Sequence, residues 1–136
     1  MERLTQRLRL AEKALKTLED VLKLKNVTDI HRDAAIQRFE YTFEAVWKAS
    51  QSFLRENEGI EAGSPKATIR GLFQTGYFNE SQAQLALHMA DDRNLTSHTY
   101  NETLSDHIFK SLPEYASLMK SCLSSIGKQI KKTSPL

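Results

Sequence analysis

The sequence is poor in the residues that make tight turns. Glycine and proline together fill only eight positions, five glycines and three prolines. This is about half of their usual share in globular proteins. Sandwiches and barrels need a turn every roughly 8–12 residues, so the shortage disfavours both of these fold classes.

Cysteine and long apolar runs are also scarce. Cys122 is the single cysteine, so the chain cannot form an internal disulfide, and a lone cysteine is a poor signal for zinc. No uninterrupted apolar run exceeds three residues. The sequence therefore contains neither a transmembrane helix nor the core of a signal peptide, and we expect a cytoplasmic protein.

Charge of one sign is not in large excess either. The 136 residues carry 19 basic and 17 acidic side chains, a net charge of +2. This balance argues against a protein that binds nucleic acid by its overall charge, so any nucleic acid would have to be bound at a local site. The hydrophobic content of 40% and the charged content of 26% are typical of one globular domain at this length.

Apolar residues recur at helical spacing along almost the whole chain. The pattern predicts an all-α fold, an up-and-down bundle of four to five helices. We expect a first helix with a leucine-rich seam that ends near Lys25, followed by a turn over residues 26–29 and a fresh N-cap. A second helix is expected from about Asp29 to Asn57, with the aromatic residues of its buried stripe as the largest core contribution.

Capping residues predict where the later helices begin. Ser64 followed by Pro65 starts a short third helix that ends at Gly76. Asn79, with Gln82 three positions later, forms a capping box for a fourth helix.

A fifth helix is expected to start at Asn101, and Pro113 lies inside it, which predicts a kink or a restart. Residues 128–136 contain three lysines and a proline, and are expected to be a flexible basic tail. The expected organisation is thus a single helical domain over residues 1–127 with the tail behind it.

The segment between the fourth and fifth helices concentrates chemically active side chains. Residues 91–100 read DDRNLTSHTY. Histidine titrates near neutrality and can move protons, and the planar fork of arginine matches phosphate. Phosphodiester cleavage without a metal needs a base for the ribose 2′-OH, an acid for the leaving 5′-oxygen and a cation for the phosphate. Arg93 and His98 are therefore candidate catalytic residues.

The spacing of these two residues sets a geometric condition. On a continuous helix Arg93 and His98 lie about 140° apart, whereas Arg93 and Tyr100 share a face. The first two converge only if the helix breaks between them or if a two-fold axis brings two copies of the segment together. The purely structural alternative is that Arg93 pairs with an acid and His98 caps a helix end.

Three segments resemble one known family. The pattern Arg93-Asn94-x3-His98-x-Tyr100 matches the R-x4-H-x-Y signature of HEPN domains that are partnered with a minimal nucleotidyltransferase, including the asparagine after the arginine. The segments QRFEYTFEAVWK over 37–48 and SPKATIR over 64–70 are similar to the same subfamily. The three segments occur in order, and the resemblance spans roughly residues 30–126.

The resemblance implies a specific activity. It implies a homodimeric toxin of a toxin–antitoxin pair, a metal-independent RNA endonuclease in which Arg93 and His98 of both copies line a cleft at the dimer interface. Asn94 would orient the imidazole or hold a ribose hydroxyl. A partner nucleotidyltransferase would neutralise the toxin by AMPylation of Tyr100. The same family also implies an alternative, a non-catalytic substrate- or nucleotide-binding subunit of the nucleotidyltransferase.

The remaining polar residues are weaker candidates. His88 and Asp92 are four residues apart and could face a metal, but a third ligand is missing, and His107 is interpreted as an ordinary residue near a helix start. We therefore predict no metal site. Glu40 and Glu44 form a solvated face or, in a dimer, line the cleft. No glycine-rich phosphate loop is present, so no cofactor is expected and the nucleotide-binding core must belong to the partner.

Overall fold

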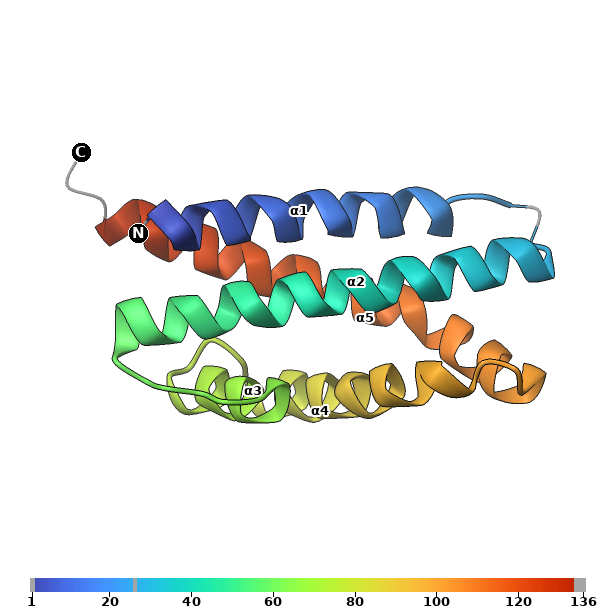
Figure 1. Cartoon of the computed structure of the whole chain (residues 1–136). Helices are drawn as coiled ribbons and strands as arrows, with labels where there is room; N and C mark the ends of the chain where they lie inside the picture. The colour runs from blue at the N-terminus through green and yellow to red at the C-terminus, as the bar shows by residue number, and fades with distance from the viewer. Residues whose placement is uncertain (1, 26, 134–136) are drawn as a thin grey trace.

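The computed structural model describes residues 2–25 and 27–133, and all regular structure within them is helical. The five α-helices are α1 (Glu2–Leu22), α2 (Asp29–Phe53), α3 (Pro65–Gln74), α4 (Glu80–Leu95) and α5 (Glu102–Thr133). A π-helical turn, Leu54–Glu58, extends α2, and a 3-10 turn, Thr96–His98, extends α4. The predicted all-α bundle is confirmed (Figure 1).

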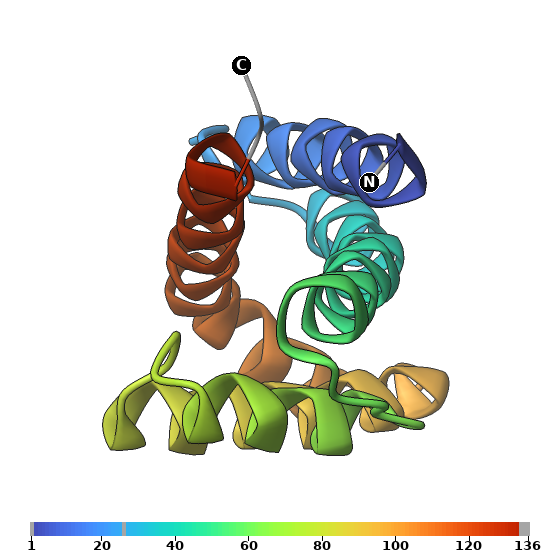
Figure 2. The same ribbon diagram turned by 90° about the vertical axis from the view of Figure 1, so that its left-hand side faces the viewer.

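The helices run up and down and form two groups. Figure 2 shows α1, α2 and the later part of α5 surrounding one core, with α3 and α4 side by side as a layer beneath them. α1 packs on α2 and α5, whereas the α3–α4 layer is joined to the rest through α2 and α5. The connection from α4 to α5 therefore lies at one end of the lower layer (Figure 1).

The core contains the apolar stripes that the periodicity predicts. Phe39 of α2 is fully buried and stacks on Tyr115 of α5, with ring centroids 5.6 Å apart. In α1 the leucine-rich seam is buried as expected, and Val21 is the buried residue near the end of the helix. Tyr115 of α5 and Phe39 and Phe53 of α2 are the largest fully buried side chains of this core.

Side-chain caps begin the helices where the sequence predicts them. Thr28 accepts a hydrogen bond from the backbone N–H of His31 at the start of α2, and Ser64 accepts one from Ala67 at the start of α3. The capping box of Asn79 and Gln82 is present with both hydrogen bonds. The first helix ends at Leu22, earlier than the expected Lys25, and Asn26 of the expected turn lies outside the described residues.

Glycine ends two of the helical segments. Gly59 follows the π-helical turn with φ of 69°, and Gly76 follows α3 with φ of 85°. Side chains with a Cβ rarely adopt this left-handed conformation, so the two glycines stop the helices at these points.

α5 differs from the expectation in its length. It runs through Pro113 as one helix and changes direction between its first part and the rest (Figure 2), which is the kink rather than the restart. Residues 128–133 continue α5, although we expected the tail to begin at Lys128. Residues 134–136 lie outside the described residues, so the flexibility of the end stays a prediction.

A buried arginine fixes the start of α5 on α2. The side chain of Arg32 is 8% exposed, and its Nη1 donates to Oδ1 of Asp106 on α5 at 3.0 Å. Its Nε donates to Asp33 at 3.2 Å. The hydrogen bond to Asp106 raises the pKa of Arg32, so this cation stays charged in spite of its burial. The contact positions the helix that follows the candidate segment.

Candidate functional site

The helix that carries Arg93 breaks soon after it. α4 ends at Leu95 and tightens into the 3-10 turn over Thr96–His98. The buried Thr96 stabilises the break, because its Oγ1 donates to the carbonyl oxygen of Arg93 at 2.7 Å and accepts from Nη1 of Arg93 at 3.2 Å. The break places His98 and Tyr100 on a short connection before α5 rather than on a continued helical face. We call residues 93–100 the α4–α5 connection.

Arg93 points from this connection toward α2. Its Nη2 lies 3.7 Å from Oε1 of Glu44, and its side chain is 27% exposed. The other carboxylate oxygen of Glu44 accepts a hydrogen bond from Nε1 of Trp47 at 3.2 Å. The Nε atom of Arg93 is buried without a hydrogen-bond partner. Arg93 therefore pairs with an acid within one chain, and Glu44 rather than Glu40 is the acid that joins it.

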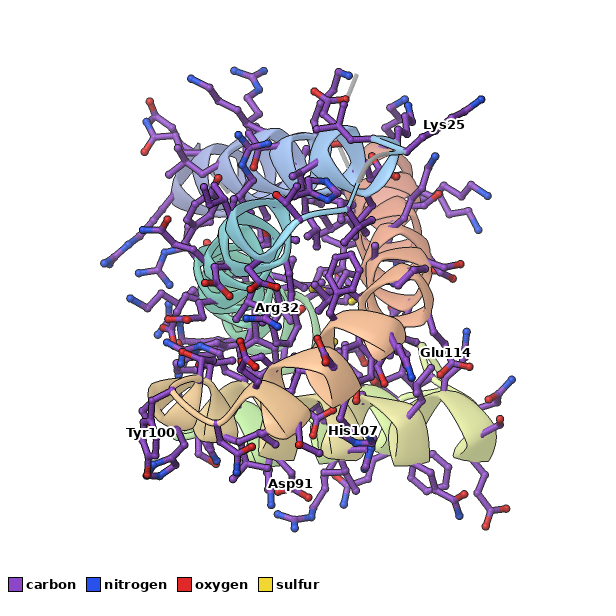
Figure 3. All side chains as sticks on the ribbon, turned by 90° about the vertical axis from the view of Figure 1, so that its right-hand side faces the viewer. Lys25, Arg32, Asp91, Tyr100, His107 and Glu114 are labelled. Carbon is purple, nitrogen blue, oxygen red and sulfur yellow. The ribbon has the colours of Figure 1, made fainter. Side chains whose placement is uncertain are left out.

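His98 and Tyr100 form a second, exposed contact. The Oη atom of Tyr100 lies 3.3 Å from Nδ1 of His98, and the two rings meet edge to face with centroids 5.9 Å apart. Tyr100 is 84% exposed. Figure 3 shows it at the margin of the molecule, directed away from the bundle. A phenol hydroxyl beside an imidazole nitrogen is an acceptor for group transfer with a base already in place.

Asn94, which is part of this connection, lines a pocket. The pocket has a volume of about 290 Å³ and is lined by residues of α2, of the start of α3 and of α4: Phe43, Ser64, Pro65, Lys66, Ala90 and Asn94. All of these residues except Ala90 come from the three segments that carry the family resemblance. The N-terminus of α3, a region of positive potential, forms one wall, and Lys66 pairs with Asp91 at 2.5 Å.

The structure does not bring all predicted site residues into one contact. Among the described residues no ion pair or hydrogen bond joins the side chains of Arg93 and His98, because the first turns to Glu44 and the second to Tyr100. Asn94 lines the pocket, and in the described part of the chain no hydrogen bond joins its side chain to His98. The break in the helix alone therefore does not bring Arg93 and His98 together within one chain. Of the two routes that the spacing allows, this leaves a two-fold axis that places two copies of the segment side by side.

Several participants carry no signal in the sequence. The pocket and its Lys66 are not indicated by any pattern of their own, although SPKATIR is part of the family resemblance. Asp92 is 3% exposed and accepts a hydrogen bond from Oη of Tyr115 at 2.5 Å. Its burial could not be inferred because acidic residues are mostly exposed.

None of the helices in the described part of the chain is both long and apolar enough to span a membrane.

Comparisons with known proteins agree with this architecture. Residues 6–128 match a family model described as nucleotidyltransferase substrate binding protein like. A solved structure from Thermus thermophilus is 54% identical, covers 85% of this chain and 98% of its own, and superposes with a TM-score of 0.83. A Haemophilus influenzae protein, described as revealing the fold of a substrate-binding domain of a nucleotidyltransferase, is 19% identical, covers 88% of this chain and 98% of its own, and has a TM-score of 0.74. The comparison with curated proteins found no match.

Proposed function

The chain belongs to the family of nucleotidyltransferase substrate-binding proteins, and from this premise we propose that it is the partner of a nucleotidyltransferase, with Tyr100 as the acceptor of a nucleotidyl group. The observation that carries the proposal is the state of Tyr100. Its side chain is 84% exposed, and its hydroxyl lies within hydrogen-bond distance of His98. An enzyme can therefore reach the phenol without any rearrangement of the bundle.

Nucleotidyl transfer to Tyr100 can be written as a balanced reaction with Tyr100, His98 and a nucleoside triphosphate. Oη of Tyr100 attacks the α-phosphorus of a nucleoside triphosphate held by the partner, and a new oxygen–phosphorus bond forms. The bond from the α-phosphorus to the oxygen that bridges to the β-phosphorus breaks, and pyrophosphate leaves. The phenol proton passes to Nδ1 of His98, 3.3 Å away. His98 thus acts as the base, provided that its tautomer leaves Nδ1 free to accept.

The pocket beside Asn94 supports a binding role for the same surface. The amino end of α3 and the ammonium group of Lys66 give one wall a positive potential that suits a phosphate-bearing ligand. This binding role requires no catalysis by the chain itself. It corresponds to a substrate-binding subunit, the role that the family description names.

A label-transfer assay tests the proposal. The chain is incubated with a minimal nucleotidyltransferase from the same genome, recognised by its G-S-x10-D-x-D motif, and with ATP labelled in the α-phosphate. We expect label on the wild type and none on Tyr100→Phe. Tyr41→Phe is the matched control, because Tyr41 is also exposed but hydrogen-bonds Thr17, away from the α4–α5 connection. Equal labelling of Tyr100→Phe and the wild type would overturn the assignment.

A second candidate function is metal-independent RNA cleavage by a homodimeric toxin. It is favoured by the partly exposed guanidinium of Arg93, which lies close in sequence to the exposed His98. In a two-fold dimer one His98 would take the proton of the ribose 2′-OH while the 2′-oxygen attacks phosphorus. The other His98 would protonate the leaving 5′-oxygen, and Arg93 would stabilise the phosphate. AMP on Tyr100 would add bulk and negative charge beside His98 and block this reaction.

RNA cleavage in the presence of EDTA tests this second function. An active nuclease leaves 2′,3′-cyclic phosphate ends, loses activity in Arg93→Ala and in His98→Ala, and keeps it in Tyr100→Phe. Arg9→Ala is the control for loss of a positive charge, because Arg9 is exposed on α1. Cleavage that survives both active-site changes would exclude this mechanism. Transfer of label without any cleavage would leave the chain as a non-catalytic binding subunit.

A further inference from the structure

In the folded chain a third potential metal ligand lies beside the two that the sequence indicates. His88 and Asp92 lie one turn apart on α4, and His107 of α5 lies beside them. Figure 3 places His107 where the first part of α5 crosses α4. One ligand atom from each of the three side chains lies within 4.8 Å of the other two. The third ligand that the sequence lacks is therefore present in the folded chain.

The carboxylate of Asp92 is the buried member of the cluster. Its side chain is 4% exposed, and its Oδ2 lies 3.8 Å from Nε2 of His88. Lys66 pairs with Asp91 and Arg93 pairs with Glu44, and among the described residues no lysine or arginine forms an ion pair with Asp92. A buried carboxylate is costly unless a positive charge compensates it. A metal ion between Asp92 and the histidines would provide that charge.

Tyr115 supplies the support that metal-bound carboxylates usually have. Its hydroxyl donates to Oδ2 of Asp92 from the core of the bundle and fixes the orientation of the carboxylate. His88 and His107 are exposed. A metal ion can thus reach the cluster from solvent. It would bind the buried, fixed carboxylate of Asp92 and the two exposed imidazoles, which are free to rotate.

We propose that His88, Asp92 and His107 bind one Zn²⁺ ion per chain at the crossing of α4 and α5. Two imidazoles and one carboxylate are a common zinc donor set, with water in the fourth position. Magnesium and calcium prefer all-oxygen sites. Zinc ligands lie about 2.0–2.1 Å from the metal, so the three ligand atoms must draw together by roughly 1 Å, a shift that the exposed imidazoles reach by rotation.

The site lies on both sides of the α4–α5 connection. Asp92 directly precedes the connection, and His107 follows it on the first turns of α5. A bound ion therefore joins the two helix ends between which His98 and Tyr100 are held. This role is independent of the nucleotidyl transfer and of the RNA cleavage proposed above, since neither reaction is routed through the metal.

Equilibrium dialysis tests the proposal. Full-length protein without a purification tag is stripped of metal, freed of chelator and dialysed against Zn²⁺, and bound zinc is measured by mass spectrometry. We expect one ion per chain for the wild type and at least about tenfold weaker binding for His88→Ala and for His107→Ala. His98→Ala is the matched control, an exposed histidine outside the cluster, and should bind zinc as the wild type does.

Two further measurements keep the test independent of folding. Far-UV circular dichroism checks that each variant is helical, and both altered histidines are exposed, so their removal should leave the bundle intact. Co²⁺ as a spectroscopic substitute should give visible absorption bands in the wild type that are absent from folded His107→Ala. If the wild type binds no zinc, or if the two histidine variants bind it as tightly as the wild type, the proposal is wrong.

Discussion

Arg93 is held between two groups with opposite consequences for phosphate binding. Thr96 fixes the direction of its side chain, which preorganises the guanidinium, whereas the carboxylate of Glu44 neutralises part of its charge. A phosphate that binds Arg93 has to compete with Glu44. The residue is thus positioned for use but restrained within the single chain.

Removing the competing charge should strengthen RNA binding. In Glu44→Gln the amide can still accept from Trp47, but it no longer neutralises Arg93. Because the pair is partly exposed, we expect the affinity for a short RNA to rise about twofold to fivefold, measured by fluorescence anisotropy. Glu40→Gln on the same helix removes the same charge without touching Arg93 and should change the affinity less. An equal rise in both variants would point to overall charge instead of Arg93.

The hydrogen bond from Tyr115 to Asp92 makes stability depend on alkaline pH. Burial, and then the neighbouring carboxylate, raise the pKa of Tyr115 well above its ordinary value of 10.0. The unfolded chain loses this proton near pH 10 while the folded chain keeps it, so the contribution to stability is complete below pH 10 and decreases above it. We expect the difference in unfolding free energy between the wild type and Tyr115→Phe to shrink as the pH rises above 10, as followed by urea denaturation. A difference that stays constant would contradict this.

The sequence predicts which residues belong to the candidate site but not how their side chains are directed. Arg93, His98 and Tyr100 were found because their types and spacing carry a signature. The directions of their side chains were not predictable, since they depend on Glu44 from α2 and on the 3-10 turn that Thr96 stabilises. Spacing along one chain does not encode contacts between helices.

Among the helices, capping residues predict the start positions most reliably. Ser64, Asn79 and Gln82 act locally, because each satisfies backbone N–H groups within three residues of itself, and these starts are confirmed. The continuation of α5 through Pro113 was less predictable. The proline removes one backbone donor and crowds the carbonyl group one turn before it, which bends the helix, while the later part of α5 packs on α1 and α2 and stays helical.

The contact of Arg32 with α5 should contribute measurably to stability. In Arg32→Ala the link from α2 to Asp106 and the packing of the side-chain stem are lost. The three acids around Arg32 are themselves mostly exposed, so they are left in water, and the expected loss is roughly 1–2 kcal/mol. Chemical denaturation measures it, with Arg9→Ala as the exposed control at under about 0.5 kcal/mol. Equal effects of the two changes would mean that the buried contact does not hold α5 on α2.

For the whole molecule, the single cysteine reports on the integrity of the bundle. Cys122 of α5 is buried beside Ser50 of α2, and burial raises the pKa of its thiol to about 11. Near neutral pH almost no thiolate forms, and reagents cannot reach it. We expect Ellman's reagent to react slowly with the native protein and rapidly after denaturation. Rapid reaction of the native protein would show that α2 and α5 separate readily.

The net charge of +2 is small because basic and acidic side chains are nearly equal in number, and some of them pair in the folded chain. Lys66 at the pocket and Arg93 at the α4–α5 connection each lie next to an acid. Under the proposed function, a phosphate-bearing ligand would be bound at the end of the lower helical layer where these two cations lie.

The central claim is that Tyr100 accepts a nucleotidyl group, and the most direct test is to locate the modification. The chain is co-expressed with its nucleotidyltransferase, purified and digested, and its peptides are sequenced by tandem mass spectrometry. The account predicts an AMP adduct on Tyr100, decreased in His98→Ala because the base is lost, and no adduct on the exposed Tyr41. An adduct on a different residue, or full modification of Tyr100 without His98, would contradict the account of acceptor and base respectively.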